Sequence, residues 1–400
     1  MNIATESKYT WPLSRQVLKT LAPKASSSAA TSPSLGLAAG VTQSVSTVVT
    51  TPTTSNSLSL NAGWELDLWG RLSGAVSAAE ARLQASSADL AAARLSAQAL
   101  LTQSYFSLRS AEAQADLLER SVGAYQRSLQ LTQNRYAGGV ASAADVAQAT
   151  TQLRSTQAQL VDSTASRALL EHAIATLLGK PAAAFSLPRT AQLPVAPAAP
   201  VQLPASLLER RPDIAAAERR VAAANAQLGV AQSAFFPSLN LSASAGYRGP
   251  DLANLLNAPN LFWSLGPALA LTLFDGGARQ ATQDSARASM DQAAAVYRQT
   301  VLVALQEVED NLVSAASLQE QATLQADAHD AAQRNLDITN NQYKAGTVSY
   351  LNVVTAQTTA LAAERTLLDV RNRRLAATAT LLKNLGGRWD ASQAVAPAAR

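Results

Sequence analysis

The sequence contains no cysteine, only two histidines and few charged residues. Without cysteine, these 400 residues can form no disulfide, thiolate metal site, catalytic thiol or lipidated cysteine. His172 and His329 are isolated in alanine-rich sequence, which favours helix-surface positions over a catalytic role. Charged residues make up 15 % of the chain, against about 25 % in typical globular proteins. Aromatic residues contribute only 5 %, so we expect close helix-on-helix packing rather than one large core.

Long apolar runs and basic clusters are also missing. No segment approaches the roughly 20 apolar residues of a membrane-spanning helix. The net charge of +4 is small for the length and the basic residues are dispersed, which argues against a nucleic-acid groove. The N-terminus MNIATESKYTWPLSRQ lacks the charged start, apolar middle and cleavage site of a signal peptide, which by itself indicates a cytoplasmic protein.

What the sequence does contain is an internal repeat. Two segments, NRYAGGVASAADV and NQYKAGTVSYLNV, match without gaps at an offset of 207. The matched pairs include Asn134 and Asn341, Tyr136 and Tyr343, Ser142 and Ser349, Val146 and Val353, and Gly179 and Gly386. The chain is therefore a tandem duplication, and each copy is expected to have the same internal order.

Each copy contains two stretches with the period-two alternation of a β-strand. In the second copy, SLNLSASAGY and WSLGPALALTLF, separated by a Gly/Pro/Asn-rich loop, predict a hairpin; SPSLGLAAG and the segment from Leu58 to Leu68 predict its counterpart. One face of each strand carries small polar residues and the other is apolar and uncharged, which favours a water-filled outer-membrane barrel over a soluble half-buried sheet. Pro267 fits poorly, because proline belongs at strand edges or bulges.

Aromatic residues near the strand ends are expected to lie at the membrane interfaces. They are Trp64, Trp69, Phe235, Phe236, Tyr247, Trp263 and Phe274. Four strands cannot close a barrel, and lipid does not tolerate an open sheet edge, so other copies of the chain must complete it.

A long segment without proline follows each hairpin, at about 71–136 and 278–343. As helices, these segments would be about 100 Å long. Each is followed by a glycine-containing turn and a second helical stretch of about 35 residues. The turns therefore predict the tips of helical hairpins, with Gly138 or Gly139, and Gly346, at positive φ and with Ser142 and Ser349 as N-caps.

The segment LLERRPDIAAAERRVAAANAQLGVAQSAFFPSLNLSASAGYRG, residues 207–249, resembles the signature of the outer membrane factor family. These are the TolC-like and OprM-like channels of tripartite efflux pumps, and we place the chain in the NodT-type lipoprotein branch. ELDLWGR, residues 65–71, and the two tips extend the resemblance over residues 30–390. It implies an α+β membrane protein: a homotrimer with a twelve-stranded barrel in the outer membrane and a tunnel of helical hairpins in the periplasm.

The resemblance also implies partners and site residues. Besides outer-membrane lipids, the partners are a periplasmic adaptor (membrane fusion) protein and an inner-membrane pump; no enzyme activity, cofactor, metal or nucleic acid is implied. The adaptor would contact the tips through Tyr136, Gly138, Gly139, Val140, Ser142, Tyr343, Gly346, Thr347, Val348 and Ser349. Leu351 and Thr355 would face the aperture; many relatives carry a carboxylate at the position of Thr355, so Asp145 is the remaining acidic candidate.

The resemblance divides the chain into eight segments. They are an atypical N-terminal remnant 1–31, a β-hairpin 32–69, a helical hairpin 70–180, a linker 181–211, a helix 212–235, a second β-hairpin 236–275, a second helical hairpin 276–386 and a tail 387–400. Relatives begin with a further helix of the Arg-Pro-Asp type, so we expect the start to be truncated. The function implied is passive export of drugs or other toxic small molecules. The alternative from the residues is a structural or adhesive coiled-coil surface protein.

Overall fold

The computed structural model describes residues 28–44, 53–190, 192–196 and 210–387. The chain forms two compact units. The helical unit comprises the described residues of Ala91–Arg211 and Leu302–Asp390; the sheet unit comprises those of Leu13–Leu90 and Pro212–Val301. The elements are β1 Ser34–Ser44, β2 Thr53–Leu66, α2 Arg71–Ala137, α3 Ala143–Leu177, η1 Ala182–Ala184, α4 Pro212–Ser233, β3 Ser238–Gly249, η3 Ala258–Asn260, β4 Leu261–Ala270, α5 Ala278–Ala345 and α6 Tyr350–Asn384.

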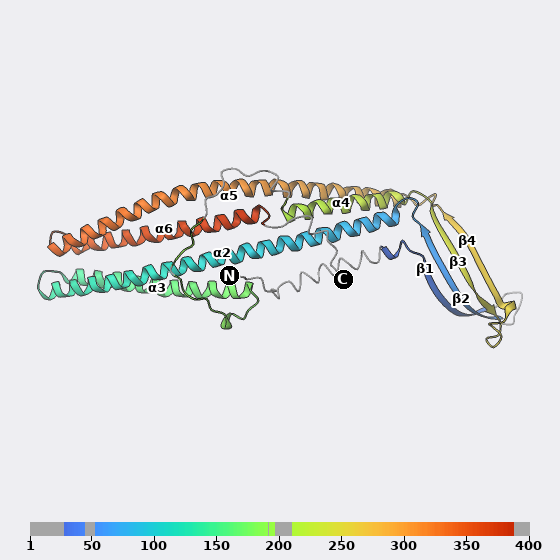
Figure 1. The fold of residues 1–400 in the computed structure, drawn as a ribbon, viewed down its shortest axis with the longest axis horizontal. Helices are drawn as coiled ribbons and strands as arrows, with labels where there is room; N and C mark the ends of the chain where they lie inside the picture. Colours follow the sequence, from blue (N-terminus) through green and yellow to red (C-terminus); the bar gives the residue numbers. More distant parts are fainter. Residues whose placement is uncertain (1–27, 45–52, 191, 197–209, 388–400) are drawn as a thin grey trace. The chain divides into compact units, whose positions relative to one another are not determined.

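The sheet is antiparallel, with strand order β1-β2-β3-β4 (Figure 1). Its register aligns the apolar residues of all four strands on one face, for example in the row Leu37, Leu60, Ala245 and Trp263. The next row, on the opposite face, is Ala38, Ser59, Gly246 and Phe262. The predicted division into an apolar face and a face of small residues is therefore present, with Phe262 as a large exception.

The strands differ from the prediction at their ends. β4 ends at Ala270, which pairs with Ser238, so Leu271 and Leu273 lie beyond the strand. The reason is that Pro237 precedes β3 and has no N–H, so the ladder cannot continue. Pro267 lies within β4, opposite Leu241, and β4 is an edge strand of this sheet, where proline is tolerated.

Matching aspartates cap the two long helices. Asp67 accepts hydrogen bonds from the amides of Leu72 and Ser73 at 2.9 and 2.8 Å. Asp275 accepts from the amide and the Nε of Arg279 at 3.0 and 2.7 Å. The Arg279 side chain is the main cause that holds the pKa of Asp275 below its usual value. Both junctions therefore use a carboxylate at the positive end of a helix.

In the sheet unit, α4 packs closely on α2. A Cβ at Gly74 would lie 3.1 Å from a methyl of Val230, so glycine allows this approach. Arg220 forms an ion pair with Asp89 at 2.6 Å. The alanine-rich, glycine-containing faces thus permit the close helix packing that the composition predicts.

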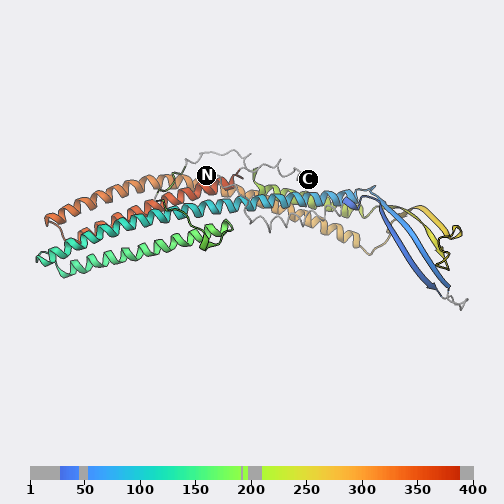
Figure 2. The same cartoon turned by 60° about the horizontal axis from the view of Figure 1, so that its bottom comes forward.

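In the helical unit, α3, α2, α6 and α5 lie side by side in that order in both views (Figures 1 and 2). Hydrogen bonds join α2 to α6 at Gln103–Thr380 and join α6 to α3 at Arg365–Gln159. Helix α6 thus contacts both α2 and α3, whereas no hydrogen bond or ion pair joins α3 to α5 among the described residues. Within the described residues, none of the helices has the length and apolarity needed to span a membrane.

Candidate functional site

The two hairpin tips have the same backbone geometry. In the first, Gly139 has φ of 74° and donates to the Tyr136 carbonyl at 3.0 Å, while the Val140 amide donates to the Arg135 carbonyl at 2.8 Å. In the second, Gly346 has φ of 79°, and the amides of Gly346 and Thr347 donate to the equivalent carbonyls, both at 3.0 Å. Both are Schellman motifs that need glycine at C′. Gly139, not Gly138, therefore has the positive φ in the first tip.

The N-caps of the returning helices differ between the tips. Ser142 forms a capping box with Asp145: the Asp145 amide donates to the serine hydroxyl at 3.1 Å, and the Ser142 amide donates to the carboxylate at 2.9 Å. Ser349 occupies the N-cap position of α6, but its hydroxyl makes no capping bond. The N-cap prediction is thus right in full for Ser142 and only in position for Ser349, because Asn352 replaces the aspartate that completes the box.

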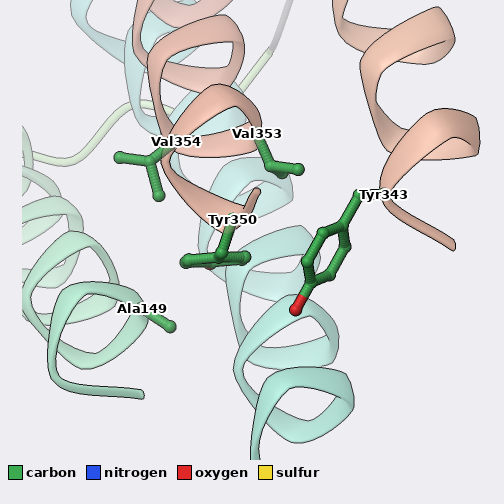
Figure 3. Close-up of a cluster of buried hydrophobic side chains, with 5 residues drawn as sticks. All are labelled: Ala149, Tyr343, Tyr350, Val353 and Val354. Atoms are coloured by element: carbon green, nitrogen blue, oxygen red, sulfur yellow. The ribbon is translucent and has the colours of Figure 1, made fainter. Parts of the chain in front are cut away.

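A small hydrophobic cluster lies beneath the second tip (Figure 3). The rings of Tyr343 and Tyr350 meet edge to face with their centroids 5.4 Å apart. Tyr343 is only 5 % exposed, whereas Tyr136, its repeat equivalent, is 52 % exposed. The ring of Tyr343, a residue of the predicted adaptor surface, is therefore part of the packing within the chain. The other members of the cluster are Ala149, Val353 and Val354.

Helix α2 holds the second tip through polar contacts as well. The Arg135 guanidinium lies 4.7 Å from the Tyr343 ring centroid and donates to the Tyr343 carbonyl at 3.1 Å. The Tyr350 hydroxyl lies 3.2 Å from that of Ser128. Burial raises the pKa of Tyr350. Sequence reasoning missed Arg135 and Tyr350, although Tyr350, Val353 and Val354 have the i, i+3, i+4 spacing of a buried helix face.

Among the residues that the structure describes, the first tip has no such contacts of its own. Ala143 stands at the repeat position of Tyr350, and Gln342 at that of Arg135, so the aromatic pair cannot form twice. Val140 is 67 % exposed. The remaining residues of the predicted adaptor surface divide by exposure: Gly138, Gly139, Ser142, Gly346, Thr347 and Ser349 are exposed, and Val348 is half-buried against the cluster.

The predicted aperture residues lie at the starts of the two returning helices. Leu351 is exposed, and the hydroxyl of the exposed Thr355 donates to its carbonyl at 3.0 Å. Asp145 is half-buried, with one carboxylate oxygen engaged by both the amide and the hydroxyl of Ser142 at 2.9 Å. The acidic candidate therefore already has a structural role as a cap.

The predicted interfacial aromatics fall at both ends of the sheet. At the end next to the helices, Trp69 stacks on Phe236 with centroids 4.8 Å apart and donates to the Pro237 carbonyl at 2.8 Å. At the far end, Tyr247 and Trp263 lie on the apolar face. The others at the helix end are Trp64, Phe235 and Phe274. Among the described residues, no three His, Asp or Glu side chains are placed to hold a metal ion.

The sequence matches the family described as "Outer membrane efflux protein" over residues 19–180 and 203–387. It is 33 % identical to the outer membrane protein OprJ of Pseudomonas aeruginosa over 334 residues, which is 82 % of this chain and 69 % of OprJ. It is 34 % identical over 332 residues to the toluene efflux pump outer membrane protein TtgF of Pseudomonas putida, covering 83 % of this chain and 69 % of TtgF.

The fold is likewise similar to solved structures. The outer membrane protein VceC of Vibrio cholerae superposes with a TM-score of 0.88 and 29 % identity over 96 % of this chain and 93 % of VceC. The outer-membrane channel OprN gives a TM-score of 0.91 and 28 % identity over 96 % of this chain and 88 % of OprN. The predicted fold of long helical hairpins with four strands is confirmed, and this chain belongs to the outer membrane efflux protein family, as an efflux channel protein of the outer membrane.

Proposed function

We propose that the chain assembles as a homotrimer that forms a passive duct for small toxic compounds, from the periplasm through the outer membrane. In this proposal it makes and breaks no bond; an inner-membrane pump and a periplasmic adaptor supply energy and substrate. The single observation that carries the proposal is an unpaired helix surface on α5. Leu324 of α5 is 62 % exposed, whereas Leu117, its repeat equivalent on α2, is 3 % exposed.

The repeat supplies the reason. Within the chain, the long helix of the first copy, α2, packs on the short helix of the second copy, α6. The equivalent contact would join α5 to α3, but within one chain no hydrogen bond or ion pair joins these two helices among the described residues, and they run apart in both views (Figures 1 and 2). Val161 of α3 and Ile338 of α5 are both exposed. A head-to-tail contact between α5 of one copy and α3 of the next would cover them, and such contacts close into rings.

The same ring would complete the sheet. β1 and β4 are edge strands within one chain, and lipid does not tolerate unpaired backbone groups at a sheet edge. Pairing β4 of one copy with β1 of the next would remove both edges. The apolar face, with its exposed Leu37 and Trp263, would then face lipid, and the small residues of the other face would line the lumen. In this assembly the predicted aromatics lie at the two interfaces.

We expect engineered cysteines to detect this seam, because the chain has no cysteine of its own. Arg120 of α2 pairs with Glu364 of α6 at 3.1 Å, and the repeat equivalents are Asp327 of α5 and Gln157 of α3. The double variant Asp327→Cys with Gln157→Cys should form covalent dimers and trimers with a short thiol-reactive cross-linker, measured on denaturing gels.

The matched control is Arg120→Cys with Glu364→Cys, which should cross-link within one chain and give no ladder. If this control pair reacts but the seam pair stays monomeric, the head-to-tail arrangement is wrong.

The tips are proposed as the adaptor-contact surface, with the first tip providing most of the apolar area. Tyr136 and Val140 are exposed there, whereas Tyr343 and Val348 of the second tip are turned into the hydrophobic cluster. The second tip would contribute mainly its backbone and the polar residues Thr347 and Ser349. Leu351, Thr355 and Asp145 remain the proposed aperture residues.

A charge on the first tip should weaken adaptor binding. We expect Val140→Glu to reduce the affinity for the adaptor by about tenfold or more, since a buried charge would replace an apolar contact. The oligomer should persist, because Val140 is 67 % exposed. Surface plasmon resonance against the periplasmic adaptors of the source bacterium measures the affinity, and size-exclusion chromatography measures the oligomeric state. Val195→Glu, at an exposed linker position, is the control; equal effects of the two variants would argue against the tip.

A further inference from the structure

The linker between the two repeats is bound by four charged side chains of the helical unit, three of them buried and one, Arg167, nearly so. Arg109 and Glu112 come from α2, and Arg167 and Glu171 from α3. Together they receive the backbone of Leu187–Thr190, which we name the strap. The contacts form a closed network between the two helices and the strap, and neither the tips nor the sheet takes part in it.

The network ties α2 to α3 through one carboxylate. Glu112 accepts from Arg109 at 2.6 Å and from Arg167 at 2.9 Å. Arg167 also pairs with Glu171 at 2.9 Å. All four side chains are buried or nearly so. Because ions in such surroundings are weakly screened, removal of one partner leaves an uncompensated buried charge.

The same side chains bind the strap only through its backbone. Arg167 donates to the Leu187 carbonyl at 2.7 Å, and the Leu187 amide donates to Glu171. Arg109 donates to the Pro188 carbonyl at 2.8 Å, and the Thr190 amide donates to Glu112 at 3.1 Å. The strap thus has four backbone hydrogen bonds to charged groups, which are the stronger class of hydrogen bond.

The second helical hairpin lacks this network. The repeat equivalents of Arg109, Glu112, Arg167 and Glu171 are Ala316, Gln319, Arg374 and Thr378. Only the arginine is kept, and it donates to the neutral Gln319 instead of to a carboxylate. Since both hairpins must fold in the same way, the charged network is not needed merely to form a helical hairpin.

We propose that the strap is a clamp that makes the first hairpin rigid where it binds, so that α2 and α3 can separate only between the clamp and the tip. Glu112 lies 25 residues before the end of α2 at Ala137, or roughly 37 Å along the helix axis. That length is the part of the first hairpin that is free to bend. The clamp is a property of one chain and does not depend on the oligomer.

The clamp also responds to acid. Burial acts to raise the pKa of Glu171, but the Leu187 amide and the charge of Arg167 outweigh it, so the pKa is lowered from 4.5. The groups around the Glu171 carboxylate are Arg167 of α3 and the Leu187 amide of the strap. Glu112 of α2 is linked to it through Arg167. Because this pKa is lowered, the stabilisation that ionised Glu171 gives to the fold is complete above pH 4.5. It is lost as the pH falls through the pKa of Glu171 in the folded protein.

The first test is cleavage by trypsin after Arg189, whose exposed side chain can enter the protease once the strap leaves the helices. We expect Glu112→Gln to accelerate cleavage at this bond at least about tenfold in the detergent-purified protein, because the strap then dissociates more often. Glu119→Gln is the matched control, since Glu119 pairs with Arg189 at 3.5 Å in an exposed position. Its cleavage rate should remain that of the unmodified protein.

A second variant covers the case in which Glu112→Gln does not fold. Leu187→Pro removes one strap donor, the amide bonded to Glu171, and leaves all four charged side chains and the Arg189–Thr190 bond in place, so it should also accelerate cleavage. Unchanged cleavage in the folded variants, or equal acceleration by Glu119→Gln, would overturn the proposal.

The second test measures where the hairpin can open. Spin labels at Thr102 and Thr176 lie on the linker side of the clamp, and labels at Gln126 and Ser155 lie on the tip side. In the cysteine-free background, we expect the linker-side pair to give the narrower distance distribution and to broaden in Glu112→Gln. A linker-side distribution as broad as the tip-side one in the unmodified protein would contradict the clamp.

Discussion

Replacing Gly246 by alanine is expected to remove most of the folded protein from the outer membrane. Gly246 lies in β3 opposite Ser59 of β2. A Cβ at this position would lie 2.1 Å from the Leu58 carbonyl oxygen and 2.6 Å from the Cα of Ser59. Both are backbone atoms, so no side chain can move aside and the central strand pair must separate.

The expected destabilisation is about 3 kcal/mol or more, the upper end for overpacked sites. The free energy of unfolding of a typical protein is roughly 5–15 kcal/mol, so this loss would be a large part of it. The measurement is the amount of folded protein extracted from outer membranes and its thermal unfolding midpoint in detergent.

Gly266→Ala is the matched control for this prediction. Gly266 lies on the same face of the sheet in the neighbouring strand β4, and a Cβ there would meet no atom within 4 Å. We expect this variant to be recovered in nearly normal amounts. Equal loss of both variants would mean that a general requirement for small residues on this face of the sheet, and not the contact with β2, explains the effect.

The second large effect is expected for Gly386→Ala, just beyond the end of α6. Gly386 has φ of 80°, and a Cβ would lie 2.3 Å from the Arg210 carbonyl oxygen. The substitution would therefore combine a strained left-handed backbone with a collision against backbone. The adjacent Arg211 is buried and donates to the Asn384 carbonyl at 3.3 Å and pairs with Glu307 at 2.9 Å. A shift of this segment would break those contacts too.

We expect Gly386→Ala to lower the free energy of unfolding by about 3 kcal/mol or more, from overpacking together with strain. Gly139→Ala separates the two causes, because Gly139 has φ of 74° but open space around its Cβ. Strain alone should destabilise by about 1–2 kcal/mol. The two variants are compared by their thermal unfolding midpoints, monitored by circular dichroism. Similar midpoints for both variants would mean that the collision with Arg210 contributes nothing.

The two tips arise from one duplicated sequence but differ in structure. Their Schellman turns are the same because Gly139 and Gly346 stand at equivalent positions. Their surroundings differ because Tyr350 and Arg135 have no aromatic or basic counterpart in the other copy. A variant at Tyr343 should therefore act on packing within the chain, whereas a variant at Tyr136 acts on exposed surface.

The local features of this protein were determined by its sequence alone. Alternation of apolar and small polar residues identified the strands, and the 207-residue offset identified the duplicated tips, because both are patterns between neighbouring or equivalent positions. The choice of Gly139 over Gly138 could not be made in this way, since both residues fit the turn and only the hydrogen bonds of the helix end distinguish them.

Only the tertiary structure decided which residues are buried against distant partners. Tyr136 and Tyr343 stand at equivalent positions of the repeat, and their exposure differs because α2 covers one tip of the chain and no element covers the other among the described residues. The charged network around the strap was equally hidden, because Glu112 and Arg167 are 55 positions apart and meet only when the hairpin closes. Contacts of this kind depend on the path of the whole chain, which no local pattern contains.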